Sequence, residues 1–216
     1  MHLALRIFLS ALFALTAFFS EAQNAESWKL KSDKNSVKVY YRSTGDVHEI
    51  KLLYRMKARM SNLMHLLNDV DTYPIWGYKI TEAHQVRHVS DNEMYYYTLI
   101  DFPWPLSDRD MVMHTKMTQD PETRVIISQS KAVKGMVPPK KGVVRITDAR
   151  TNWRIMPAGA GFVDIEYQLY SHPGGNLPDW AINMALDYGP KESLKNIENM
   201  LKDPKYAKLR VAHIMD

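Results

Sequence analysis

Alternating apolar and polar residues dominate the middle of the chain and predict antiparallel β-strands. The clearest example is residues 162–170, which place four apolar side chains on one face: Val163, Ile165, Tyr167 and Leu169. Such a strand buries one face and leaves the other in solvent. Further strands are expected at 37–42, 48–58, 80–88, 94–102, 110–118, 124–130, 143–146 and 152–156. The pattern therefore predicts one large antiparallel meander.

Helical periodicity flanks this predicted sheet. A first helix is expected after Ser61, a residue type that caps helix N-termini, and a short helical turn near Trp28. A second helix should begin at Pro178 and Asp179 and run to about residue 201. Its buried side would consist of Ile182, Leu186, Leu194, Ile197 and Leu201.

Pro190, preceded by Gly189, lies inside the second predicted helix. Proline has no backbone N–H and its ring clashes with the preceding turn, so we expect a kink there. An amphipathic helix that follows a complete meander has to cover the concave face of the sheet. The chain is therefore predicted to be an α+β protein, with its helices segregated towards the two ends of the sequence.

The segment FPWPLSDRD, residues 102–110, connects two predicted strands. Its two prolines restrict φ to about −65°, and the residues before them favour extended backbone. Ser107 and Asp108 are suited to closing a turn with a side-chain hydrogen bond. Asp108, Arg109 and Asp110 invite interpretation as an acid–base cluster, but their place at the start of a strand favours a structural ion pair and turn cap.

The strand after this turn places Arg109, Met111, Met113, Thr115 and Met117 on one face. Methionine side chains are flexible and fill irregular spaces better than they form a tightly interlocked core. The stripe therefore suggests an adaptable internal space, although ordinary core packing is also compatible with it.

The N-terminal segment resembles a secretory signal peptide. His2 and Arg6 precede an uncharged apolar run over 7–20, and Ser20 and Ala22 put small residues at the positions that a signal peptidase reads. We expect residues 1–22 to be a signal peptide and 23–216 a single domain, which predicts a periplasmic or secreted protein. An uncleaved anchor is the alternative.

Composition narrows the function. The chain has no cysteine, which excludes disulfides and an acylated lipoprotein cysteine. Its net charge of +4 is spread without a run of five like charges, which disfavours a nucleic-acid partner. A weak preference for anionic membranes, and hence a transient membrane contact, stays open.

A search for catalytic chemistry gives little. His84 and His88 would share one face of a strand, but no acidic or cysteine ligand lies at metal-binding spacing. The sequence has no HExxH, GxSxG, P-loop or dinucleotide-binding motif. We predict no catalytic residue, no metal and no cofactor.

Four segments carry a family resemblance. They are the aromatic-PLSDRD turn at 104–110, the Asp69-to-Trp76 helix ending, VPPKKGVVR at 137–145 and GNLPDWAIN at 175–183. In this order and spacing, the chain resembles a START domain, the lipid-transfer module related to the steroidogenic acute regulatory protein, over about residues 28–201.

The resemblance implies a helix-grip (START/Bet v 1-like) fold, in which a curved antiparallel sheet wraps around the long C-terminal helix. It also implies an apolar tunnel that carries or sequesters one lipid or other apolar ligand beneath this helix. The expected ligand-binding residues are Tyr96, Met111, Met113, Thr115, Val163, Ile165, Tyr167, Ile182, Leu186 and Tyr188.

In sterol-binding members of the family, the tunnel contains an acidic residue and an arginine. The matching positions here are Tyr96 and Thr115, so a neutral pair replaces a charged one. We expect a monomer that is not an enzyme. The alternatives are a cyclase-like or hydrolase-like enzyme on the same fold, and an interaction module without a cavity.

Overall fold

A computed structural model describes residues 28–34, 36–44, 47–175 and 177–216. The predicted signal peptide, residues 1–22, lies outside these ranges. Within them, no helix combines the length and the apolar character needed to cross a membrane.

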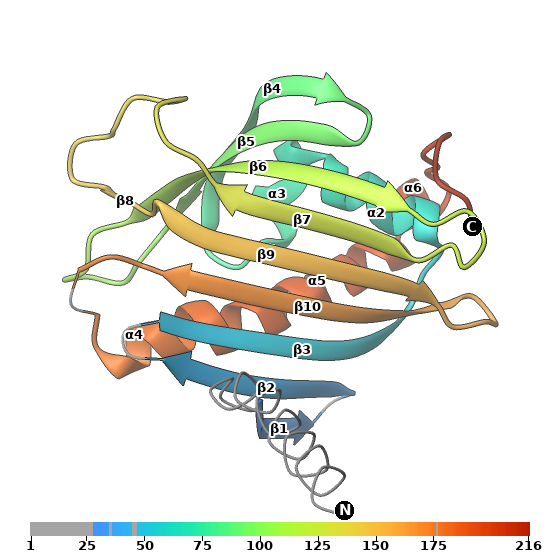
Figure 1. Ribbon diagram of the computed structural model, residues 1–216, viewed down its shortest axis with the longest axis horizontal. Helices are drawn as coiled ribbons and strands as arrows, with labels where there is room; N and C mark the ends of the chain where they lie inside the picture. Colours follow the sequence, from blue (N-terminus) through green and yellow to red (C-terminus); the bar gives the residue numbers. More distant parts are fainter. Residues whose placement is uncertain (1–27, 35, 45–46, 176) are drawn as a thin grey trace, which may run out of the picture.

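A curved ten-stranded sheet forms the body of the protein (Figure 1). Its spatial order is β1-β2-β3-β10-β9-β7-β6-β5-β4, with β8 pairing only with β6. The strands are β1 (Lys29–Lys34), β2 (Val37–Thr44), β3 (Val47–Lys57), β4 (Ile80–Ser90), β5 (Glu93–Ile100), β6 (Arg109–Gln119), β7 (Ile126–Ala132), β8 (Val144–Arg145), β9 (Asp148–Pro157) and β10 (Phe162–His172).

The prediction of a single meander is corrected in two respects. The sheet consists of two meanders, β1 to β3 and β4 to β10, which are joined because β10 pairs antiparallel with β3. Strand β8 pairs parallel with the start of β6 and takes no part in the meander. Both β3 and β10 alternate apolar and polar residues, so pairing them extends one continuous apolar face.

The helices cover one face of this sheet (Figure 1). They are α2 (Met60–Asn68), the 3₁₀ turn η1 (Val70–Thr72), α3 (Tyr73–Trp76), α4 (Asp179–Asn183), the π-helical turn η2 (Met184–Tyr188), α5 (Gly189–Lys202) and α6 (Pro204–Ala207). The continuous run from α4 to α5 is the long C-terminal helix. The helix-grip prediction is confirmed.

The irregularity predicted at Pro190 takes the form of a π-helical turn. The amide of Gly189 donates to the carbonyl of Met184, five residues earlier. Because Pro190 cannot donate to Leu186 and would clash with its carbonyl in a regular helix, the wider turn resolves the conflict. A π-helical turn inside an α-helix often accompanies a functional site.

Two local predictions near the N-terminal side are wrong. Trp28 precedes strand β1 and is not in a helical turn. Ser61 is not the N-cap of α2, because the cap is Arg59, whose backbone N–H donates to Asn62 Oδ1 at 3.0 Å. The Ser61 hydroxyl instead donates to the carboxylate of Asp216 at 2.8 Å, which ties α2 to the C-terminal segment.

The turn over 102–110 is capped as predicted, because the Phe102 N–H donates to Asp108 Oδ1 at 3.0 Å. The cluster also forms a structural ion pair, as predicted. Asp110 pairs with Arg145 (Nη2 to Oδ2, 2.8 Å), since β8 runs beside the start of β6. The Arg109 guanidinium lies 4.6 Å from the centroid of the Phe102 ring.

Candidate ligand-binding site

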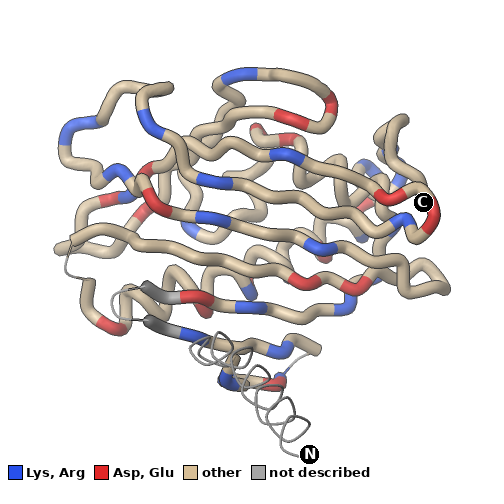
Figure 2. Tube along the Cα trace, in the orientation of Figure 1, with Lys and Arg blue, Asp and Glu red and all other residues tan. Residues whose placement is uncertain are grey.

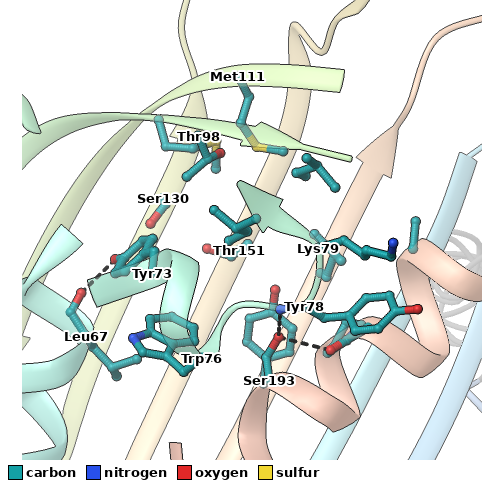
Figure 3. Close-up of a pocket in the computed structure, with 18 of the residues that line it drawn as sticks. Leu67, Tyr73, Trp76, Tyr78, Lys79, Thr98, Met111, Ser130, Thr151 and Ser193 are labelled. Atoms are coloured by element: carbon teal, nitrogen blue, oxygen red, sulfur yellow. Dashed lines mark hydrogen bonds between the residues drawn. The ribbon is translucent and has the colours of Figure 1, made fainter. Parts of the chain in front are cut away.

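An internal cavity of about 220 Å³ lies between the concave face of the sheet and the helices α3, η2 and α5 (Figure 3). Strands β5, β6, β7, β9 and β10 form one wall. Residues 76–80, which connect α3 to β4, form part of the other wall together with the start of α5. The cavity thus lies beneath the irregular part of the C-terminal helix.

Most of the wall is apolar or aromatic. Tyr73 and Trp76 pack with their ring centroids 4.6 Å apart, and Trp153 and Tyr167 make a second pair at the same distance. Further apolar walls are provided by Leu67, Ile100, Phe102, Met111, Met113, Leu169 and Met184. Such a surface favours an apolar ligand, because each Å² of apolar area removed from water stabilises binding by about 25 cal/mol.

Hydroxyl groups gather on the sheet side of the cavity. The Ser130 hydroxyl donates to Thr115 Oγ1 at 2.8 Å across the β6–β7 pair. Thr98, Ser128 and Thr151 also line the wall. In Figure 3, Ser130 and Thr151 extend from the sheet towards Tyr73 and Trp76 on the opposite wall.

The tyrosines of the cavity are neutral. Burial raises the pKa of Tyr96 to about 12, although a hydrogen bond with Ser130 lowers it slightly. Burial also raises the pKa of Tyr73 and of Tyr167 above the usual value for a phenol. These phenols therefore keep their protons at neutral pH and act as hydrogen-bonding groups only.

Among the described lining residues, Lys79 alone carries a formal charge. Its ammonium is partly exposed and pairs with Asp101 at 2.7 Å. The hydrogen bond with Asp101 also raises the pKa of Lys79. The charge is thus at the rim and already neutralised.

Side-chain contacts fasten the C-terminal helix over the cavity. Ser193 Oγ accepts from the Tyr78 N–H at 2.9 Å, and Asn196 Nδ2 donates to the Trp76 carbonyl at 3.1 Å (Figure 3 shows the Ser193 contact). Asp187 in η2 pairs with Lys31 of β1 at 3.1 Å and with Lys191 at 2.8 Å.

The charge of Asp187 depends on these two lysines. Partial burial raises the pKa of its carboxyl, but the hydrogen bonds from Lys191 and Lys31 outweigh burial and lower the pKa overall. The carboxylate is therefore ionised at neutral pH and holds the π-helical turn against the edge of the sheet.

The structure brings five of the predicted residues together in the cavity wall: Tyr96, Met111, Met113, Thr115 and Tyr167. Whether they contact a ligand remains a prediction. Val163 and Ile165 belong to the packed core and do not line the cavity. Ile165 pairs with Tyr54, whose hydroxyl bonds Glu198 of α5, so this end of β10 is filled by the helix.

The three predicted lid residues also lie elsewhere. Ile182 and Leu186 face a separate surface groove between the helix and β1, beside Lys31. Tyr188 is 50% exposed and packs edge-on against Tyr78, with ring centroids 5.1 Å apart. The residues at and beside the π-helical turn that line the cavity are Met184, Ala185 and Pro190.

Several lining residues were not predicted from the sequence. The alternation of β7 puts Ser128 and Ser130 on the same side as Ile126, which identifies this face as inward. Phe102 was assigned only to a rigid turn, and the indole of Trp153 lies opposite Tyr167 in the β9–β10 register. The alternation could have identified the serines, but the inward turn of Phe102 had no sequence signal.

The geometry offers binding chemistry. No group of three or more His, Cys, Asp or Glu side chains that could hold a metal occurs in the part of the chain that the structure describes. His84 stacks on Tyr97 at 5.0 Å. What the cavity provides is apolar contact area and neutral hydrogen-bonding groups.

Comparison with known proteins places this geometry in a family. The START domain family model matches residues 11–205, a range that begins inside the predicted signal peptide. An uncharacterized protein of Pseudomonas aeruginosa is 30% identical over 190 residues, covering 85% of this chain and 92% of that one.

Two further relatives have descriptive names. Phosphatidylcholine transfer protein of Rattus norvegicus is 25% identical over 185 residues, which cover 82% of this chain and 84% of that protein. The crystal structure of a STAR-related lipid transfer protein fragment from Xanthomonas axonopodis superimposes with a TM-score of 0.73 at 30% identity, covering 82% of this chain and 99% of that one. The chain belongs to the START domain family.

Proposed function

We propose that this protein is a non-enzymatic lipid carrier, which holds one lipid or other apolar ligand in the cavity beneath the C-terminal helix. The observation that carries the proposal is the mainly apolar cavity beneath the C-terminal helix in a member of the START domain family. The names of the rat and Xanthomonas relatives, which both specify lipid transfer, support it.

The helical segment Asp179–Lys202 is proposed to be the lid. Side-chain contacts at Asp187, Ser193 and Asn196 hold this segment, and they can break without unfolding the sheet. The π-helical turn at Met184–Tyr188 provides the point of bending, since its hydrogen bonds are irregular. Ligand exchange would follow a local opening of this segment.

Loops at one end of the sheet are proposed to contact membranes transiently. Trp104, between β5 and β6, is 91% exposed, and Trp180 of α4 is 48% exposed. A Cβ atom at Gly174, which leads into α4, would lie 3.5 Å from the Val144 side chain, and the Val144 N–H donates to the Asp108 carbonyl at 2.9 Å, so these segments share one end of the molecule. Figure 2 shows basic positions in the nearby β7–β8 loop, and exposed tryptophan with lysine suits a membrane interface.

The cavity argues against an interaction module without one. An enzyme on the same fold would need reacting groups that face each other in the cavity, and the described wall offers neutral hydroxyls with Lys79 at its rim. We further propose that the protein is exported, which rests on the apolar N-terminal segment, and that it acts as a monomer. N-terminal sequencing of the mature protein and gel filtration test both points.

Lipid carriage is tested by native mass spectrometry of the gently purified protein, followed by a transfer assay between vesicles. A bound mass corresponding to one lipid and catalysed transfer are expected. If no lipid co-purifies and none is taken up from vesicles of neutral, zwitterionic and anionic lipids, the carrier function is wrong.

A further inference from the structure

We propose that the cavity selects a lipid with an uncharged head group, an alcohol, ketone or ester, and that Thr115, Ser130 and Tyr96 form the site for this group. The inference rests on the proposed carrier function and specifies its ligand class. It concerns a cluster of three hydroxyls on the sheet wall.

The cluster has unused hydrogen-bonding capacity. Ser130 donates to Thr115 Oγ1 at 2.8 Å, while Thr115 reaches the Gln129 carbonyl only at 3.4 Å. A hydroxyl has one donor and two acceptor positions, and Tyr96 adds another beside Ser130. A ligand hydroxyl or carbonyl can bind here without disturbing the Ser130–Thr115 bond.

The same wall disfavours a charged head group. A buried anion requires a cation or several donors aimed at it, and the one charged group in the described wall is Lys79, which Asp101 neutralises at the rim. Burial raises the pKa of the nearby phenols Tyr96 and Tyr167, which shows that this environment disfavours an anion. A carboxylate or phosphate at this depth would meet the same penalty.

The size of the cavity limits the hydrocarbon part. An engineered cavity of about 150 Å³ holds benzene, and pockets for drug-sized ligands begin near 300 Å³. At about 220 Å³, this cavity suits a compact ring system or part of a single chain. It does not hold the two acyl chains of a phosphatidylcholine in this conformation, unlike the ligand in the name of the rat relative.

The test compares probes of one chain length on the full-length, delipidated protein. The probes are a fatty alcohol, its methyl ester analogue, the fatty acid at pH 8 and the lysophosphatidylcholine, with a diacyl phosphatidylcholine as the two-chain probe. The alcohol and the ester should bind at least ~10-fold more tightly than the charged probes. Equal or tighter binding of the acid or of either phospholipid would overturn the head-group proposal alone.

If no probe binds at all, the carrier function is wrong together with this inference. If the probes bind without the expected preference, only the head-group proposal is wrong, so the two failures are distinguishable. Thr115→Val, Ser130→Ala and Tyr96→Phe should each weaken alcohol binding by about 2- to 10-fold, the value of one hydrogen bond. Binding of the alkene of equal length should not change. Thr118→Val, on the exposed face of the same strand, is the matched control.

An effect on the alkene as large as that on the alcohol would mean that these hydroxyls act only on the shape of the cavity, and would contradict the proposal. Because each variant removes a single polar atom or exchanges it for a methyl group, folding is checked by its thermal midpoint. A variant with an unchanged midpoint and unchanged alcohol affinity would also overturn the assignment of that residue.

Discussion

Strands β9 and β10 run through two different environments on the same concave face. Towards one end, Ile155 pairs with Ile165, and both are fully buried in the core. Towards the other end, Trp153 pairs with Tyr167 and Thr151 with Leu169, and all four line the cavity. Two residues further along the same pair of strands, the packed core therefore gives way to the cavity.

The difference lies in residue type and in the helix above. Branched aliphatic side chains fill the first region, and α5 is regular where Glu198 bonds Tyr54. Aromatic rings, methionines and hydroxyls border the second region, beneath a π-helical turn. The filled region should determine stability, whereas the region around the cavity should determine ligand binding, and four measurements test this division.

The largest effect is expected from Ile155→Ala. This side chain is fully buried in the filled region, so its truncation should lower the free energy of unfolding by about 2–5 kcal/mol, measured by urea denaturation. Met111→Ala, which borders existing space, should cost less. Equal losses at the two positions would remove the distinction between the regions.

Thr151→Leu should affect binding and spare stability. The threonine projects into the cavity (Figure 3), and a larger apolar side chain would occupy ligand space without burying a new polar group. We expect lipid uptake from vesicles to fall by about 10-fold or more, with unfolding free energy changed by less than about 1 kcal/mol. Thr118→Leu, on the exposed side of β6, serves as the control; unchanged uptake by the Thr151 variant would mean that the ligand lies elsewhere.

The lid contact at Asp187 should control exchange rate. Its pKa is lowered in the folded protein, so its pairing with Lys31 and Lys191 is complete above the unfolded value near 3.8 and is lost as the pH falls through the lower folded pKa. Asp187→Asn should mimic the acidic state at neutral pH and accelerate ligand release by about 2- to 5-fold.

The measurement for Asp187→Asn is release of a fluorescent lipid by stopped flow. Asp164→Asn provides a matched control, because Arg55 lowers the pKa of Asp164 on the outer face of the sheet, away from the lid. Equal acceleration by the two variants would contradict a specific role for the π-helical turn.

The smallest effect is expected from Tyr54→Phe. The change removes the hydroxyl that bonds Glu198 and leaves the ring in place, so the unfolding free energy should fall by about 1 kcal/mol. Ligand affinity should not change, because this contact fastens the filled region. A clear loss of affinity, measured on the same lipid probe, would show that the two regions are coupled.

The strands and the covering helix could be predicted from the sequence because alternation and helical periodicity are local properties. The pairing of β3 with β10 could not, since it joins segments more than 100 residues apart and several strands have equally suitable apolar faces. The shared face of Met111, Met113 and Thr115 on β6 could be predicted for the same local reason, and these residues lie in the cavity wall.

The lid residues show where local reasoning fails. Regular 3.6-residue spacing put Ile182 and Leu186 on the buried side of the helix, whereas Met184 and Ala185, at the start of the π-helical turn, are the residues that line the cavity. Val163 and Ile165 share the correct face of β10, but the boundary between filled and hollow space depends on where α5 and its neighbours reach. Alternation identifies a face, and tertiary packing decides how far along that face a cavity extends.

Strand β10 also determines the order of events during synthesis. It joins the first three strands to the rest of the sheet and supplies Tyr167 and Leu169 to the cavity wall, so the wall is incomplete until residues 162–172 have been made. Contacts of such long sequence separation form late. A nascent chain therefore cannot trap a lipid, and each molecule should acquire its ligand only after the whole domain has closed.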